Sequence, residues 1–128
     1  MDRILLIDDH SSMGVIFKTL LTAMGCAPSN FVFCQDVESA RENLRESPAY
    51  DLIFLDHFVP PTYDFRDSLV LLSGVDAGTP IVLLSGTIPE DFGTHAIDAR
   101  ISRCLHKDDI SVRNLHHLLT ELDVPLAS

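Results

Sequence analysis

The sequence RILLIDDHSS, residues 3–12, contains both the strongest indication of fold and the first residues of a site. Four aliphatic residues, Ile4 to Ile7, lead directly into two aspartates, Asp8 and Asp9. A short run without polar interruption is typical of a strand that is covered on both faces. Adjacent like charges are unfavourable at the end of such a strand unless a positive group lies among them. The stretch therefore predicts a buried strand with a charged site at its carboxyl end.

Further apolar runs of strand length recur along the chain, at residues 31–34, 52–55, 81–84 and, more weakly, 101–105. Segments with helical spacing of apolar residues separate and follow them. We expect these helices at about 12–25, from Asp36 as N-cap to Pro48, at 66–74, after Pro89 and at 111–122, where Ser111 caps the start. Five repeats of strand then helix, joined by right-handed crossovers, predict a doubly wound α/β fold with helices on both faces of a parallel sheet.

Length and composition restrict the class of protein. The chain has 128 residues and a net charge of -10 with no basic cluster, which argues against direct binding of nucleic acid. We expect one domain over residues 1–124, with 125–128 as a tail or the start of a linker. The three cysteines, Cys26, Cys34 and Cys104, are widely spaced and odd in number, so we expect core thiols in a reducing compartment. No signal peptide or membrane-spanning run is recognisable, which favours a cytoplasmic location without membrane association.

Polar residues end most of the expected strands. Ligands of open α/β sheets bind at the carboxyl ends of the strands, so these residues define the candidate site: Asp8, Asp9, Asp56, Ser85 and Lys107. If the first and third strands are neighbours, the three carboxylates converge, and a cation is needed among them. Lys107 supplies one charge, and hard oxygen ligands favour Mg²⁺ as a second. The set predicts phosphoryl chemistry in which one carboxylate is the nucleophile.

These five residues, in this order and spacing, resemble the pattern of the receiver domain of two-component response regulators. The resemblance covers essentially the whole chain and implies a flavodoxin-like (βα)5 fold with strand order 2-1-3-4-5. It implies that Asp56 accepts a phosphoryl group from a phosphohistidine of a sensor histidine kinase or histidine phosphotransfer protein. It also implies Mg²⁺ bound by Asp9, Asp56, the backbone carbonyl of Phe58 and, through water, Asp8. Ser85 would donate to the phosphoryl group and take part in switching.

The sequence departs from the family pattern on the expected output side. Cys104 stands where receivers usually carry Tyr or Phe as the second switch residue, and Asp108 stands where Pro usually follows the lysine. A cis bond between Lys107 and Asp108 is therefore not expected. Receivers commonly form homodimers through their fourth helix, fifth strand and fifth helix. Here that face would comprise the helix after Pro89, the strand at 101–105 and the helix at 111–122.

Two other functions are compatible with parts of the pattern. The departures from the family pattern at Cys104 and Asp108 are consistent with a pseudo-receiver, an interaction module that works without phosphorylation. A small Mg²⁺-dependent phosphatase is a third possibility, although its nucleophile would more commonly lie after the first strand. Under the receiver interpretation the domain catalyses only its own phosphorylation and dephosphorylation. His57 follows Asp56 directly, and strand alternation predicts that its side chain points away from Asp56.

Overall fold

The computed structural model describes residues 3–46, 50–62, 64–75, 78–122 and 124, so the predicted tail at 125–128 lies outside the described residues. The strands are β1 (Ile4–Ile7), β2 (Phe31–Cys34), β3 (Leu52–Asp56), β4 (Ile81–Ser85) and β5 (Ile101–His106). The helices are α1 (Ser11–Ala23), α2 (Val37–Glu46), α3 (Phe65–Leu72) and α4 (Val112–Glu121). Within these residues, no helix is both long enough and apolar enough to cross a membrane.

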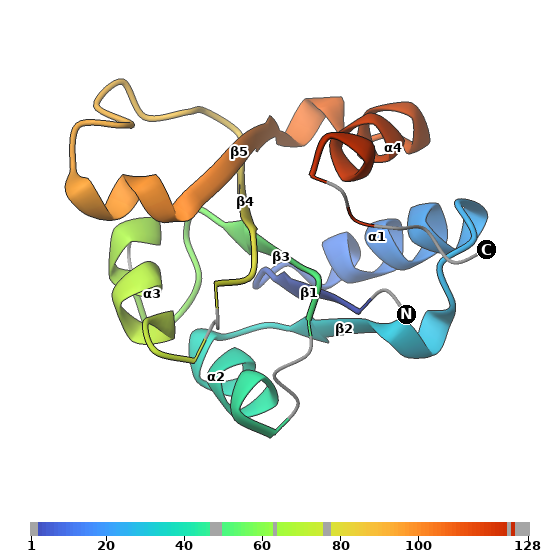
Figure 1. The fold of residues 1–128 in the computed structure, drawn as a ribbon, viewed down its shortest axis with the longest axis horizontal. Helices are drawn as coiled ribbons and strands as arrows, with labels where there is room; N and C mark the ends of the chain where they lie inside the picture. Colours follow the sequence, from blue (N-terminus) through green and yellow to red (C-terminus); the bar gives the residue numbers. More distant parts are fainter. Residues whose placement is uncertain (1–2, 47–49, 63, 76–77, 123, 125–128) are drawn as a thin grey trace.

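The five strands form one parallel sheet in the order β2-β1-β3-β4-β5. Helices α2 and α3 lie on one face of this sheet, and α1 and α4 lie on the other (Figure 1). The predicted doubly wound, flavodoxin-like architecture and its strand order are therefore confirmed. In register, Ile7 of β1 lies between Cys34 of β2 and Leu55 of β3, so these strands end at the same edge of the sheet.

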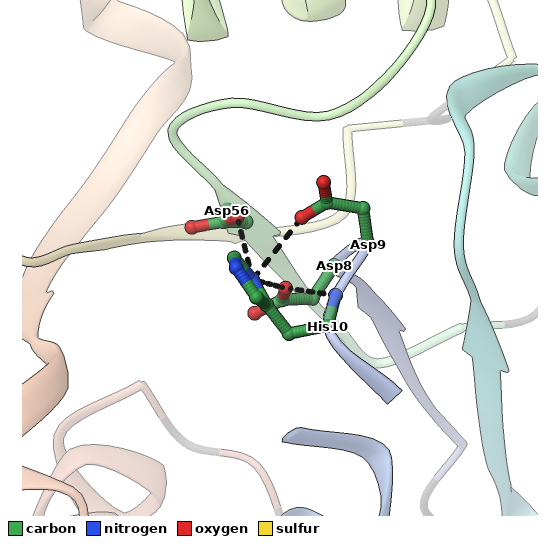
Figure 2. Close-up of side chains that lie close together, drawn as sticks. All are labelled: Asp8, Asp9, His10 and Asp56. Atoms are coloured by element: carbon green, nitrogen blue, oxygen red, sulfur yellow. Dashed lines mark hydrogen bonds and ion pairs between the residues drawn. The ribbon is translucent and has the colours of Figure 1, made fainter. Parts of the chain in front are cut away.

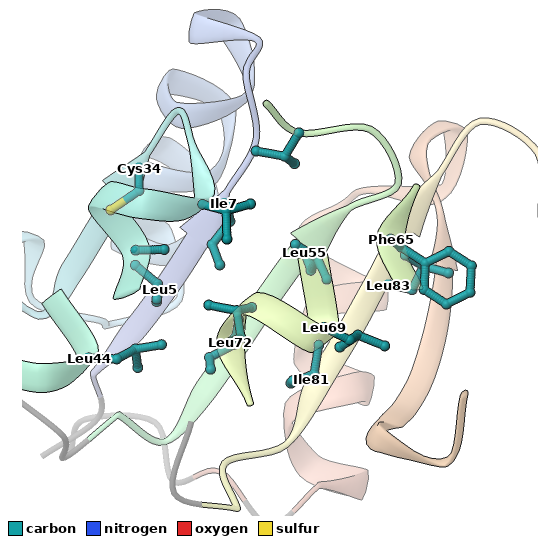
Figure 3. Close-up of a cluster of buried hydrophobic side chains, with 14 of the residues drawn as sticks. Leu5, Ile7, Cys34, Leu44, Leu55, Phe65, Leu69, Leu72, Ile81 and Leu83 are labelled. Carbon is teal, nitrogen blue, oxygen red and sulfur yellow. The ribbon is translucent and has the colours of Figure 1, made fainter. Parts of the chain in front are cut away.

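Alternate residues of each central strand supply two separate hydrophobic cores. Leu5 and Ile7 face α2 and α3, in the cluster drawn in Figure 3, whereas Ile4 and Leu6 face α1 and α4. All four side chains are fully buried. Burial on both faces explains why β1 is apolar at every position instead of alternating with polar residues.

Polar caps and close packing fix where the helices lie. The Ser39 amide donates to Asp36 Oδ1 at 2.7 Å at the start of α2, and the Asn114 amide donates to Ser111 Oγ at 3.1 Å at the start of α4. Both caps were expected from the sequence. In α1, Gly14 allows the helix to approach β2, because a Cβ at this position would lie 2.5 Å from the Phe33 ring.

The helix predicted after Pro89 is wrong. In the part of the chain that the structure describes, turns follow Pro89 and only a 3₁₀ helix, Ala96–Arg100, precedes β5. The connection extends outward between β4 and β5 (Figure 1). The described residues therefore form four α-helices, where the (βα)5 pattern predicts five. The helix that is absent is the one predicted after Pro89, which was expected to form part of the dimer face.

Side-chain interactions with α3 hold this connection in its non-helical form. Arg66 of α3 donates through Nε and Nη2 to both carboxylate oxygens of Asp98, at 2.8 and 2.9 Å. Arg66 also reaches the Asp91 carboxylate at 3.2 Å. The backbone amides of Gly93 and His95 donate to Asp98 Oδ2 at 2.8 and 3.2 Å. Gly93 has φ +92°, a left-handed conformation that interrupts a helix. The Asp98 carboxylate thus accepts hydrogen bonds from two backbone amides that, in a helix, would donate to backbone carbonyl groups.

Candidate functional site at the carboxyl edge of the sheet

The carboxyl ends of β1 and β3 bring buried carboxylates together. Asp8 follows β1 directly and Asp56 is the last residue of β3; they are 0% and 3% exposed. Because Ile7 pairs with Leu55, the residues that follow, Asp8 and Asp56, lie side by side. Figure 2 shows Asp9 beside them, closer to solvent. Two carboxylates in this position need positive charge near them to remain ionised.

Lys107 supplies part of this positive charge. It follows β5, and its Nζ lies 2.9 Å from Asp56 Oδ1 and 3.4 Å from Asp8 Oδ2. Burial alone would lower the pKa of Lys107, but the hydrogen bonds and charges of Asp56 and Asp8 raise it above its usual value. Burial raises the pKa of Asp56, and the hydrogen bond from Lys107 opposes that rise. The ammonium group therefore stays charged, and its position beside Asp56 favours the ionised form of that carboxylate.

His10 lies among these carboxylates, a contact that the sequence reasoning missed. Its Nδ1 lies 2.9 Å from Asp8 Oδ1, 3.1 Å from Asp9 Oδ1 and 3.9 Å from Asp56 Oδ2 (Figure 2). The hydrogen bond with Asp8 raises the pKa of His10, and the carboxylate charges outweigh the opposing effect of burial. The available signal was a histidine two residues after Asp8, where the chain turns into α1.

The carboxylates suit a divalent cation. One ligand atom each from Asp8, Asp9, His10 and Asp56 can be chosen so that all lie within 4.8 Å of one another. Asp8 Oδ2 is buried and has no hydrogen-bond partner among the described residues, although Lys107 lies 3.4 Å away. A buried carboxylate oxygen left without a hydrogen bond is costly, and a cation would satisfy it. Mg²⁺ therefore fits the donors that are present.

Ser85 ends β4 on the same side of the sheet. Its Oγ accepts a hydrogen bond from the Thr87 amide at 3.1 Å and donates to the Thr87 carbonyl oxygen. His57 Nδ1 lies 3.2 Å from the same Oγ. The His57 ring lines the same pocket as Asp56 and packs on Phe58 and Phe65. The expectation that its side chain points away from Asp56 stays a prediction.

Phe58 lines the same pocket as Asp56, whereas Cys104 lines a different one. The Phe58 side chain is 59% exposed and stacks on the His57 ring with 4.1 Å between ring centroids. The predicted role of its backbone carbonyl as a metal ligand stays a prediction. Cys104 lies in β5 opposite Leu83, half-buried against the core beneath α2 and α3. Burial, with a smaller contribution from the Asp98 charge, raises the pKa of the Cys104 thiol, so it stays protonated at neutral pH.

These residues surround one open pocket of about 820 Å³. The pocket brings together side chains from four strand ends, as the sequence predicted for the carboxyl edge of a parallel sheet. Its lining residues are Asp9, His10, Asp56, His57, Phe58, Ser85, Gly86, Thr87, Pro89 and Lys107.

A comparison with known families identifies the fold family. The family model for the response regulator receiver domain matches residues 4–120. The chain belongs to the receiver domain family. Receiver domains are signalling modules of two-component systems, so the resemblance noted in the sequence is confirmed at the level of the family. No match is found among curated protein sequences.

Solved receiver structures share the fold of this receiver at low sequence identity. A two-component response regulator from Clostridium difficile is 20% identical, with 100% of both chains covered and a TM-score of 0.80. A response regulator receiver domain protein from Clostridium thermocellum is 19% identical, with 95% of this chain and 94% of that chain covered and a TM-score of 0.78. The signal receiver domain of an HD domain-containing protein from Pseudomonas fluorescens Pf-5 is 24% identical, with 94% and 93% covered and a TM-score of 0.76.

Proposed function

We propose that this domain, residues 1–124, is a working cytoplasmic receiver that accepts a phosphoryl group on Asp56. The donor is a phosphohistidine of a sensor histidine kinase or of a histidine phosphotransfer protein, and transfer requires Mg²⁺. The observation that carries the proposal is the environment of Asp56. This carboxylate is almost fully buried at the base of an open pocket, with the Lys107 ammonium 2.9 Å from Oδ1.

The chemistry follows from the groups around Asp56. A carboxylate oxygen of Asp56 attacks phosphorus, the phosphorus–nitrogen bond to the donor imidazole breaks, and the released imidazole keeps the electron pair and takes up a proton from water. Lys107 and the Ser85 hydroxyl lie on the same pocket and would donate to the phosphoryl oxygens. Mg²⁺, when bound by Asp8, Asp9, Asp56 and the Phe58 carbonyl, supplies positive charge for those oxygens.

Surfaces next to the pocket support output and docking through protein contacts. On α1, Val15 and Ile16 are 67% and 43% exposed, and they offer an apolar surface to the helices of a phosphodonor protein. For a homodimer we propose the surface of β5 and α4 without a fourth helix; Arg103 of β5 pairs with Glu121 of α4 at 3.4 Å on this surface. We expect no direct contact with nucleic acid or membrane.

Phosphorylation by a small phosphodonor tests the proposal. The protein is incubated with acetyl phosphate, with and without Mg²⁺, and its intact mass is measured. We expect a single phosphoryl adduct that needs Mg²⁺ and that is absent in Asp56→Asn. The matched control is Asp67→Asn, which removes an exposed carboxylate of α3 and should leave the adduct unchanged. An adduct that persists in Asp56→Asn contradicts the assignment of the acceptor.

The pseudo-receiver remains a second candidate, favoured by two observations on the output side. Cys104 replaces the usual aromatic residue, and the connection between β4 and β5 is held in a non-helical form by Arg66 and Asp98. A folded protein that binds Mg²⁺ but forms no adduct in the same assay would support this candidate. Steady release of phosphate from a small phosphoester would instead support the phosphatase alternative.

A further inference from the structure

His10 differs from the other candidate metal ligands of the pocket, because it offers a ring nitrogen and they offer carboxylate oxygens. We propose that His10 Nδ1 is a metal ligand, so that the pocket binds Co²⁺ and Zn²⁺ through one nitrogen and the surrounding carboxylates, whereas it holds Mg²⁺ through oxygen alone. The proposal concerns the same pocket as the proposed function and rests on its being a cation site. It adds a residue and a metal preference to that site.

The distances from His10 Nδ1 to the carboxylate oxygens match those between ligands of one ion. In an octahedral site with bonds of about 2.1 Å, neighbouring ligand atoms lie about 3.0 Å apart and opposite ones about 4.2 Å apart. His10 Nδ1 lies 2.9 Å from Asp8 Oδ1 and 3.1 Å from Asp9 Oδ1, which is the spacing of neighbours. Its distance to Asp56 Oδ2 is 3.9 Å, close to that of opposite ligands. The His10 and Asp9 side chains are 61% and 39% exposed, so these two are the groups that can adjust around an ion.

The buried carboxylate of Asp8 lies beside His10 and has room for a closer positive ligand. Asp8 is 0% exposed, its Oδ2 atom accepts no hydrogen bond among the described residues, and Lys107 Nζ lies 3.4 Å from that atom. The same side chain presents Oδ1 to His10 at 2.9 Å. A cation bound between Asp8 and His10 would use an oxygen that is already desolvated. The histidine therefore lies beside a fully buried carboxylate that can accept a cation.

Ligand chemistry then separates the metals. Imidazole nitrogen binds Zn²⁺, Co²⁺ and Ni²⁺ well, whereas Mg²⁺ prefers carboxylate, carbonyl and water oxygen. The His10 side chain is 61% exposed, so an ion from solvent can reach its ring nitrogen. Loss of His10 should consequently weaken binding of Co²⁺ and Zn²⁺ far more than binding of Mg²⁺.

Metal titrations of the whole chain test this inference without measuring phosphorylation. CoCl₂ is titrated into metal-free protein and followed by visible absorption, and MgCl₂ is then added as competitor. The variants are His10→Ala, Asp8→Asn and His117→Ala; His117 pairs with Glu121 on α4 and is the matched histidine control. Zn²⁺ binding is followed by the ¹⁵N chemical shift of His10 Nδ1. His10 is exposed, so His10→Ala should fold, which circular dichroism checks.

We expect His10→Ala to weaken Co²⁺ binding at least about tenfold. Removing a residue that only hydrogen-bonds a metal ligand already lowers metal affinity by about this factor, and loss of a ligand itself should cost no less. Mg²⁺ affinity should change little, His117→Ala should match the wild type, and Zn²⁺ should shift His10 Nδ1. Co²⁺ affinity that is unchanged or increased in His10→Ala overturns the inference, while Mg²⁺ binding lost in Asp8→Asn would leave the proposed function intact. If Mg²⁺ neither binds nor displaces Co²⁺, both the inference and the Mg²⁺ dependence of the proposed function fail.

Discussion

Replacement of Lys107 by methionine should destabilise the metal-free protein, because this lysine is paired with two buried carboxylates. At an effective dielectric constant of 20, its 2.9 Å and 3.4 Å contacts with Asp56 and Asp8 correspond to gross attractions of about 6 and about 5 kcal/mol. Desolvation of all three groups cancels much of this attraction. Removing one partner of a buried ion pair nevertheless lowers the free energy of unfolding by about 3–5 kcal/mol. Because the Lys107 side chain is 23% exposed, we expect a loss at the lower end of this range, about 3 kcal/mol.

Mg²⁺ should reverse this loss, since a bound cation occupies the position where positive charge was removed. A ligand at about 100 times its dissociation constant stabilises a protein by about 2.7 kcal/mol. Lys107→Met should gain more than the wild type from the same Mg²⁺ concentration, because the competing ammonium is gone. The methionine keeps an apolar stem of similar length, so packing changes little.

The assay is urea unfolding of both proteins in EDTA and in MgCl₂, followed by circular dichroism. Lys18→Met is the matched control, because Lys18 is the other lysine of the chain and is exposed on α1. We expect Lys107→Met to be about 3 kcal/mol less stable in EDTA, and the difference to shrink in MgCl₂. The reasoning is refuted if Lys107→Met is as stable as Lys18→Met in EDTA, or if Mg²⁺ stabilises wild type and Lys107→Met equally.

Three further predictions concern other parts of the molecule. The Arg66 guanidinium holds the pKa of Asp98 well below its usual range. The ionised carboxylate therefore stabilises the fold above about pH 4, and this contribution is lost as the pH falls further. In Asp98→Asn, the free energy of unfolding should fall less steeply with decreasing pH below about pH 4 than in the wild type. Gly14→Ala should cost about 1–3 kcal/mol in urea unfolding, because the new Cβ meets the Phe33 ring at 2.5 Å, and an unchanged midpoint would contradict this. Phe58→Ala should accelerate loss of phosphate from the phosphorylated protein, since the exposed ring lines the pocket, and an unaltered half-life by intact mass would exclude such shielding.

Much of the fold could be predicted because β1 is apolar throughout and β3 and β4 are apolar up to their last residue. Burial on both faces requires such runs, and the register of β1 with β3 then brings Asp8 beside Asp56 without further information. Lys107 approaches the same carboxylates because β5 ends at the same edge. Local sequence was sufficient for these residues, because each lies immediately after or at the end of its strand.

The fourth helix could not be predicted because a distant residue decides its absence. Pro89 followed by acidic residues has the composition of a helix start, and that local preference led to the wrong prediction. The bidentate pair between Arg66 and Asp98 joins positions 32 residues apart, and Gly93 adopts a left-handed conformation that fits this arrangement. No local pattern reveals such a pair, because neither residue is unusual in its own segment.

The surroundings of the two histidines at the site depend on backbone geometry outside the strands. His57 follows the last residue of β3, and its Nδ1 lies 3.2 Å from Ser85 Oγ, a contact that strand periodicity does not predict. His10 lies in the turn between β1 and α1, where side-chain direction depends on backbone geometry that residue spacing does not give. Its proximity to Asp8 and Asp9 became visible only in three dimensions.

The most direct test of the central claim is to locate the phosphoryl group chemically. The protein is incubated with acetyl phosphate and Mg²⁺ and then treated with borohydride, which reduces an aspartyl phosphate to homoserine, and its peptides are sequenced by mass spectrometry. We predict homoserine at position 56 and at no other aspartate, dependent on Mg²⁺ and strongly reduced in Lys107→Met. Homoserine at Asp8 or Asp9, or no conversion in a folded protein that binds Mg²⁺, would contradict the account of Asp56 as the phosphoacceptor.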